Sequence, residues 1–131
     1  MTDPSTSAVT QGVRIDVVTR YVAEQSEPNS NRWLFAYRIT ISNEGDQPVQ
    51  LASRHWVITN SNGVVQEVKG AGVVGQQPRM RPGEGFQYVS ACPLDTAVGT
   101  MHGTYQMLTD KGDEFEAEIP MFVLADPQAL N

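Results

Sequence analysis

The chain has 131 residues, of which 40% are hydrophobic and 18% charged, a composition typical of one folded domain and not of a disordered segment. Its formal net charge of −6 works against sequence-independent binding to a phosphate backbone, so nucleic acid is not expected as a partner. The single cysteine excludes an internal disulfide. The lack of an apolar N-terminal run or a membrane-length apolar stretch predicts a cytoplasmic chain with no membrane role.

The first predicted strand follows a polar N-terminus. Residues 1–11 are rich in Ser and Thr and are interpreted as a flexible tail. In residues 13–20, β-branched and polar side chains alternate, which is the pattern of a half-buried strand. A polar loop that contains Pro28 is expected over residues 24–31.

Residues 32–43 have the clearest strand pattern in the chain. Five large side chains share one face of this segment: Trp33, Phe35, Tyr37, Ile39 and Ile41. A helix would scatter these side chains around its circumference, whereas a strand aligns them. A turn over residues 44–48 then reverses the chain.

The rest of the chain repeats this alternation of short strands and turns. Further strands are predicted over residues 49–59, 64–69, 86–91, 100–108 and 114–119, and the last resumes after Pro120. In the first of these, Arg54 shares a face with Trp56 and Ile58. Asn-Gly at residues 62–63 and Asp-Lys-Gly-Asp at residues 110–113 are typical of hairpin turns.

These elements predict the fold class. Seven or eight short strands without an amphipathic helix indicate an all-β protein, an antiparallel β-sandwich. The domain is expected to span residues 12–126, followed by a short C-terminal tail of residues 127–131. The expected core anchors are the large aromatic side chains Trp33, Phe35, Tyr37, Trp56 and Tyr105.

Residues 70–75 read Gly-Ala-Gly-Val-Val-Gly, a literal G-x-G-x-x-G motif. A dinucleotide-binding motif of this kind needs a helix at its end, because the helix N-terminus holds the pyrophosphate. Here Pro78, Pro82 and Gly83 follow and prevent a helix of sufficient length. The glycines are therefore assigned to a loop in a different kind of fold.

The order of several motifs resembles the ApaG family over about residues 12–126. The segments that carry the resemblance are residues 37–43, 53–56, 70–78, 92–96 and 99–107, and none of them departs from the family pattern. The resemblance implies a fibronectin type III-like, and so immunoglobulin-like, sandwich. The family is loosely linked to cobalt tolerance and magnesium efflux. The domain also resembles a protein-interaction module of eukaryotic F-box and DNA-polymerase-interacting proteins, and the family has no established catalytic activity.

The glycine loop is the main candidate site for a ligand or partner. Its residues are Lys69, Gly70, Gly72, Gly75, Gln76, Arg79 and Arg81. Successive glycines can expose backbone N–H groups to an anion, and the three basic side chains can add positive charge. The alternative is a structural loop in which the glycines permit positive φ and Val73 and Val74 pack into the core.

Other reactive side chains do not form a recognisable site. His55 and His102 are the only histidines, lie on different predicted strands and lack metal-ligand spacing, so no metal or cofactor is expected. Cys92 precedes Pro93 with no helix N-terminus to activate it, which favours a structural thiol. The row Glu114, Glu116 and Glu118 is either a docking surface or the solvated face of an edge strand.

We therefore expect a protein without enzymatic activity that acts as a protein–protein interaction module. Recognition would use the loop of residues 70–77 and an exposed sheet edge, with any role in cobalt or magnesium homeostasis being indirect. The protein partner is unidentified, and exposed edges also allow a homodimer. The alternative is a sensor that binds pyrophosphate, a nucleotide or a metal–phosphate complex through the glycine loop.

Overall fold

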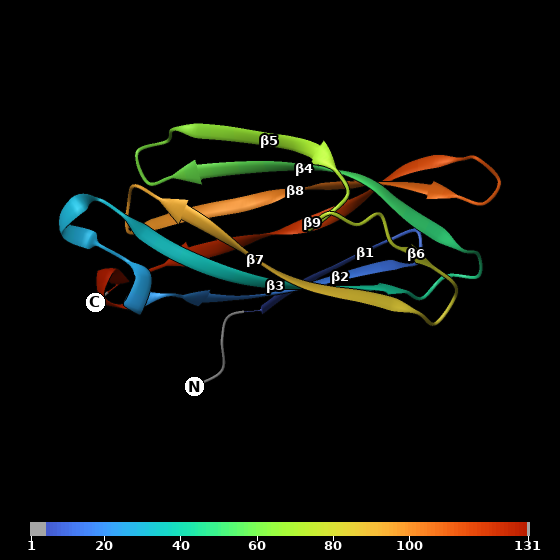
Figure 1. Ribbon diagram of the computed structural model, residues 1–131, viewed down its shortest axis with the longest axis horizontal. Helices are drawn as coiled ribbons and strands as arrows, with labels where there is room; N and C mark the ends of the chain where they lie inside the picture. The colour runs from blue at the N-terminus through green and yellow to red at the C-terminus, as the bar shows by residue number, and fades with distance from the viewer. Residues whose placement is uncertain (1–4, 131) are drawn as a thin grey trace.

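The structure, a computed structural model, describes residues 5–130. Its regular elements are strands and short 3-10 turns (Figure 1). The strands are β1 (Ser5–Thr10), β2 (Val13–Tyr21), β3 (Trp33–Asn43), β4 (Val49–Asn60), β5 (Val65–Ala71), β6 (Arg79–Met80), β7 (Gly85–Leu94), β8 (Val98–Thr109) and β9 (Glu114–Ala125). The turns are η1 (Ala23–Gln25), η2 (Pro28–Ser30) and η3 (Pro127–Leu130). None of the helical turns in this part of the chain has the length and hydrophobicity that a membrane-crossing helix needs.

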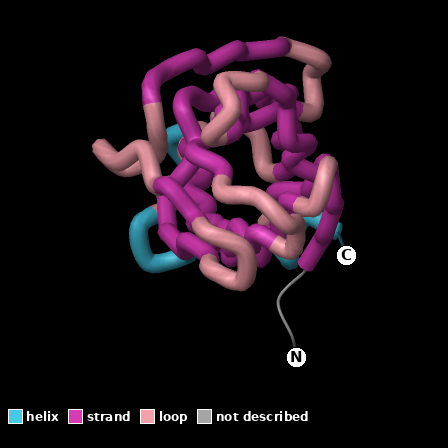
Figure 2. The backbone as a smooth tube through the Cα atoms, turned by 90° about the vertical axis from the view of Figure 1, so that its right-hand side faces the viewer, coloured by secondary structure: helices cyan, strands magenta, loops and turns pink. Residues whose placement is uncertain are grey.

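The strands form two antiparallel sheets that pack face to face. One sheet has the order β1-β2-β3-β7, and the other has the order β5-β4-β8-β9 with β6 also paired to β4. Figure 1 shows β4, β5 and β8 above β1, β2 and β3, and in Figure 2 the helical turns lie at the margin of the strands. The predicted antiparallel β-sandwich is confirmed, and it is consistent with an immunoglobulin- or fibronectin type III-like fold.

The N-terminal segment differs from the flexible tail predicted for residues 1–11. Ser5–Thr10 forms β1, which pairs with β2 along its whole length. Its small Ser and Thr side chains give little hydrophobic signal, yet every second residue is half-buried against the sandwich. The tail prediction is therefore wrong for residues 5–10. Residues 1–4 and 131 lie outside the described residues, and η3 occupies most of the expected C-terminal tail.

The strand faces predicted for residues 13–20 and 32–43 are confirmed. Alternate side chains of β2 and β3 are buried between the sheets: Val13, Ile15, Val17, Phe35, Tyr37, Ile39 and Ile41. Trp56 lies among other aromatic rings, with ring centroids 5.5 Å from Tyr37 and 5.9 Å from Phe122. Burial of each large apolar side chain contributes about 1.5–3 kcal/mol, so packing supplies the stability of the core.

A β-bulge in β4 changes which side chains face the core. The pairing of β4 with β8 shifts register between Leu51 and Ser53. Before the bulge, Leu51 is buried, and after it Trp56 is buried while Ser53 hydrogen-bonds Gln106 on the outer face. Because side chains alternate along a strand, the bulge places Arg54 on the inner face together with Trp56.

The sandwich is closed along one side and open along the other. On the closed side β1 adjoins β9, and the backbone N–H of Glu118 donates to Thr10 Oγ1 over 3.1 Å. On the open side, β5 and β7 end their sheets, and each pairs with only one of the described strands, β4 and β3 respectively. The row Glu114, Glu116 and Glu118 is exposed on β9, which is an edge strand in the sheet order.

Candidate functional site

The glycine loop connects β5 to β6 through a tight turn. Val73 and Gln76 exchange two backbone hydrogen bonds of 2.8 Å, and the central residues Val74 and Gly75 have φ of 43° and 79°. Two central residues with positive φ define a type I′ hairpin turn. Val73 is 1% exposed but Val74 is 54% exposed, so the expectation that both valines pack into the core is right for Val73 and wrong for Val74.

Each glycine of the G-x-G-x-x-G motif has a local structural role. A Cβ on Gly72 would lie 2.2 Å from the Gln76 carbonyl oxygen, and the φ of Gly72 is +61°. Gly75 takes the second central position of the type I′ turn, where positive φ favours glycine. Gly70 lies on β5, where a Cβ would come within 2.8 Å of Arg54 Nη1. The motif therefore shapes the turn, and its first glycine leaves room for the Arg54 side chain.

The polar groups predicted to bind an anion have partners within the chain. The N–H groups of Gly72, Val73 and Gln76 donate to backbone carbonyl oxygens. Arg79 forms an ion pair with Asp110, and Arg81 forms one with Glu84. These two pairs raise the pKa of both guanidinium groups through hydrogen bonds to the carboxylates.

Lys69 is the third basic side chain that the sequence predicts for an anion site. Lys69 is exposed on β5 opposite His55, and it lines a hollow with Arg54, Gly70 and Glu116. Gln76 is exposed in the turn. Phosphate binding at the glycine loop thus stays a prediction, although most of the donors and charges proposed for it already have partners.

Arg54 is the functional candidate that the sequence analysis missed. Its Nη1 donates to the carbonyl oxygens of Ala71, over 3.0 Å, and Gly72, over 2.9 Å. The guanidinium lies against Gly70, its cross-strand partner. Within residues 5–130, neither Nε nor Nη2 of Arg54 has a hydrogen-bond partner, and no acidic side chain pairs with this half-buried arginine.

Tyr37, Tyr88 and Tyr105 lie close enough to Arg54 for its charge to act on their hydroxyl groups. A hollow of about 210 Å³ beside it is lined by Tyr37, Trp56, Val73, Val74, Tyr88 and Ser90. Burial raises the pKa of Tyr37 and Tyr88, and the positive charge of Arg54 offsets this rise only in part. The hydroxyls of Tyr88 and Tyr105 hydrogen-bond each other. These phenols stay neutral near pH 7, so they supply polar contacts but no negative charge.

A groove runs from Arg54 along the open side of the sandwich. A second hollow, of about 260 Å³, shares Arg54, Tyr37 and Ser90 with the first and extends to Ile58, Gln66 and Pro93. These last three residues also line a third hollow, of about 550 Å³, which ends at η2. We call the three adjoining hollows the β5–β7 groove.

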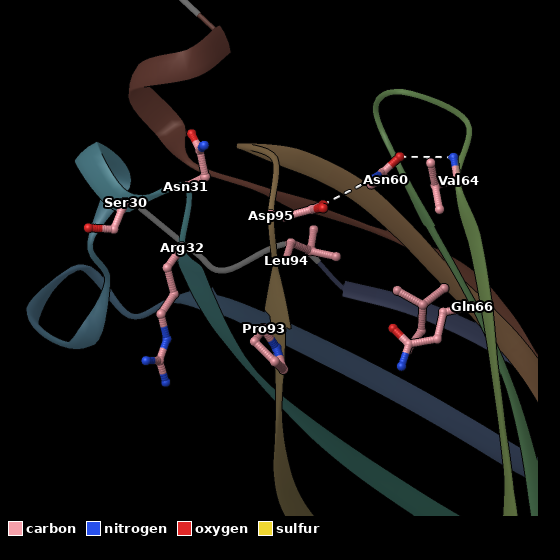
Figure 3. Close-up of a pocket in the computed structure, with 10 residues that line it drawn as sticks. Ser30, Asn31, Arg32, Asn60, Val64, Gln66, Pro93, Leu94 and Asp95 are labelled. Carbon is pink, nitrogen blue, oxygen red and sulfur yellow. Dashed lines mark hydrogen bonds between the residues drawn. The ribbon is translucent and has the colours of Figure 1, made fainter.

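Figure 3 shows the end of the β5–β7 groove that is farthest from Arg54. Gln66 and Val64 lie on one wall and Pro93 and Leu94 on the other. Asn60 Nδ2 donates to Asp95 Oδ1 over 2.9 Å, which ties the β4–β5 hairpin to the end of β7. The groove is therefore bounded at this end by a hydrogen bond and at the other by the glycine loop.

His55 lies outside the β5–β7 groove, and Cys92 is buried in the wall of that groove. His55 Nε2 is 2.7 Å from Glu67 Oε1 on the outer face of the β4–β5 pair. Cys92 is buried, and burial raises the pKa of its thiol to about 11, the opposite of the shift that an activated cysteine shows. Across residues 5–130, no three His, Cys, Asp or Glu side chains lie close enough together to hold a metal ion.

Comparisons with known proteins agree with the motifs described above. A profile of the ApaG domain matches residues 23–109. Proteins named ApaG from Thiobacillus denitrificans and Dechloromonas aromatica are 57% and 56% identical over 119 residues, which cover 91% of this chain and 94% of each relative. A crystal structure of a Bordetella pertussis protein described as ApaA has 46% identity and a TM-score of 0.86, and the match covers 98% of this chain and 99% of that one. The chain therefore belongs to the ApaG family, as its motifs predict.

Proposed function

We propose that this ApaG-family chain is a cytoplasmic, non-enzymatic protein–protein interaction module whose β5–β7 groove receives an extended segment of a partner. One observation carries the proposal: two sheet edges flank a single groove, and among the described strands neither edge is paired on that side. An unpaired edge presents a row of backbone N–H and C=O groups to which an extended segment can add as a strand.

The side chains of the groove suit such a segment. Both apolar groups, from Ile58, Pro93 and Leu94, and polar groups, from Gln66 and Ser90, line it. In strand addition the main chain supplies affinity, and pockets for alternate side chains supply selectivity. Three adjoining hollows along the groove offer such pockets. Within this proposal, any link to cobalt or magnesium homeostasis is indirect and passes through the partner.

In-cell photo-crosslinking tests this proposal. A photoreactive residue in place of Gln66 lies in the groove, and one in place of Asp113, exposed in the β8–β9 turn, is the matched control. We expect a reproducible crosslinked protein from position 66 that is absent from position 113, and a crosslinked second copy of the chain would identify a homodimer. Equal crosslinking at both positions, or none at position 66 with the chain folded and abundant, would contradict the proposal.

A further inference from the structure

We infer that Arg54 makes the β5–β7 groove selective for a segment with one acidic residue, whose carboxylate binds the Nε–Nη2 edge of the guanidinium. The inference rests on the proposed function, because it specifies the chemistry of the segment that the groove receives. Four observations support it: the fixed orientation of Arg54, its free edge, the lack of a counter-charge and the hollow beside it.

The orientation of Arg54 is fixed from two sides. Nη1 donates to the carbonyl oxygens of Ala71 and Gly72, and the plane of the guanidinium lies against Gly70. Nε and Nη2 point along the remaining edge, and neither has a partner within residues 5–130. Because the side chain is already held in place, a ligand on this edge would cost little further side-chain entropy.

Two other arginines of this chain show what such an edge binds. Arg81 donates from Nε and Nη2 to the two carboxylate oxygens of Glu84, each over 3.2 Å. Arg79 uses the same two atoms toward both oxygens of Asp110. This two-point contact is the geometry in which a guanidinium recognises a carboxylate. Arg54 presents the same pair of donors without the carboxylate.

The surroundings of Arg54 leave its charge uncompensated. The arginine is half-buried and forms no ion pair within residues 5–130. Tyr37, Tyr88 and Ser90 bring neutral hydroxyl groups to the hollow beside it. Lys69 and Glu116, which carry opposite charges, line a separate hollow that Arg54 also borders. A charge withdrawn from water without a counter-charge is unfavourable. A carboxylate from the partner would neutralise it. Tyr37 and Ser90, whose side chains hydrogen-bond each other, line the same hollow, and this pair retains one hydroxyl proton to donate.

The hollow has room for an acidic side chain, and the net charge of the chain disfavours a strongly acidic segment. The volume beside Arg54 is about 210 Å³, several times the share of about 30 Å³ that one water molecule occupies in the liquid. An acidic side chain can therefore enter it in place of water. The chain as a whole carries a net charge of −6, which repels a strongly acidic segment. Selectivity for one Asp or Glu in an otherwise neutral or basic segment follows.

Selection from a library of random dodecapeptides against the full chain tests the inference. We expect the selected peptides to share an Asp or Glu at one fixed position. Replacement of that residue by Asn or Gln should weaken binding about tenfold or more, the effect of losing a charge-assisted hydrogen bond. The same replacement should matter less than about twofold for the Arg54→Gln variant if the carboxylate contacts Arg54.

Three further variants separate the charge of Arg54 from the geometry of its guanidinium and from the effect of removing any arginine. Arg54→Lys keeps the charge but loses the two-point edge, and Gly70→Ala keeps the arginine but displaces its guanidinium, so both should lose the acidic preference. Arg38→Gln removes an exposed arginine on β3 that has no ion pair within residues 5–130, and it should keep the full preference. Loss of the preference in Arg38→Gln would contradict a specific role of Arg54.

A second readout distinguishes the failure of this inference from that of the proposed function. Acetate added to the ¹⁵N-labelled full chain should shift the Arg54 Nε–H resonance. Peptides that bind the groove without an acidic preference would overturn the inference and leave the proposed function standing. If acetate shifts the resonance but no peptide binds, the site takes free carboxylates, and both proposals fail. Silence in both experiments would also overturn both.

Discussion

Arg54 and Gly70 face each other across the β4–β5 pair, and a Cβ on Gly70 would lie 2.8 Å from Arg54 Nη1 and 3.0 Å from its Cζ. The first glycine of the G-x-G-x-x-G motif thus provides space for a guanidinium, which in turn holds the carbonyl oxygens of Ala71 and Gly72. The arginine and the glycine loop form one structural unit.

Gly70 and Gly72 should differ in how much each contributes to the stability of the fold. We expect Gly70→Ala to lower the free energy of unfolding by about 1 kcal/mol, because its φ is not positive and the cost is limited to moving the Arg54 guanidinium away from the carbonyl oxygens of Ala71 and Gly72. Gly72→Ala should cost about 2 kcal/mol or more, because its φ is +61° and its Cβ would meet the Gln76 carbonyl at 2.2 Å. Denaturant unfolding measures both values, and equal losses would contradict these roles.

The sequence predicts the sandwich well because hydrophobic alternation identifies strands directly. Trp33 to Ile41 is one example, and the side chains of that face pack inward in the structure. Arg54 shows the limit of this reasoning. The sequence shows that Arg54 shares a face with Trp56 and Ile58. The bulge at residues 51–53 that turns this face inward has no sequence signal of its own. The ion pairs of Arg79 with Asp110 and of Arg81 with Glu84 could not be predicted either, because they depend on loop conformations that strand alternation does not specify.

Val74 should be a position at which stability can be gained. It has φ of 43° and is 54% exposed, and a left-handed conformation costs a β-branched residue about 1–2 kcal/mol. We expect Val74→Asn to raise the free energy of unfolding by about 1 kcal/mol, because Asn tolerates this conformation. Val64→Asn, at an exposed valine without positive φ, is the control and should change little. A loss of stability in Val74→Asn would show that the valine side chain is needed there.

Cys92 should react slowly with iodoacetamide in the folded chain. Burial raises the pKa of its thiol from an ordinary value of 9.0 to about 11, and only the thiolate reacts. At pH 8 the thiolate fraction is therefore about 100-fold smaller than at the ordinary pKa. Alkylation rates of the folded chain and of the chain in guanidinium chloride should differ by at least that factor. Similar rates would place the thiol at the surface.

The same shift predicts how stability depends on pH. The folded state raises the thiol pKa, so it favours the neutral form. This contribution is fully present below pH 9 and is lost as the pH rises through about 11. Tyr37, Tyr88 and Tyr105 act in the same direction at higher pH, since burial raises the pKa of each. Unfolding measured from pH 7 upward should show a decline in stability above pH 9, and Cys92→Ala should show a shallower one.

Pyrophosphate should leave the backbone amide resonances of residues 72–76 in place. The N–H groups of Gly72, Val73 and Gln76 already donate within the chain, and Arg79 and Arg81 are paired with carboxylates. A titration followed by ¹⁵N spectra measures this directly, with chloride at equal ionic strength as the control. Saturable shifts confined to the glycine loop would instead support the phosphate-sensor alternative.

Amide hydrogen exchange on the full chain, with and without the protein captured at Gln66, tests the central claim most directly. Strand addition protects backbone N–H groups along the edge that receives the strand. We expect new protection along the groove-facing edge of β5 or β7 and none along the closed side at β1 and β9. Protection confined to the closed side, or to the exposed row Glu114, Glu116 and Glu118, would contradict the assignment of the β5–β7 groove as the binding site.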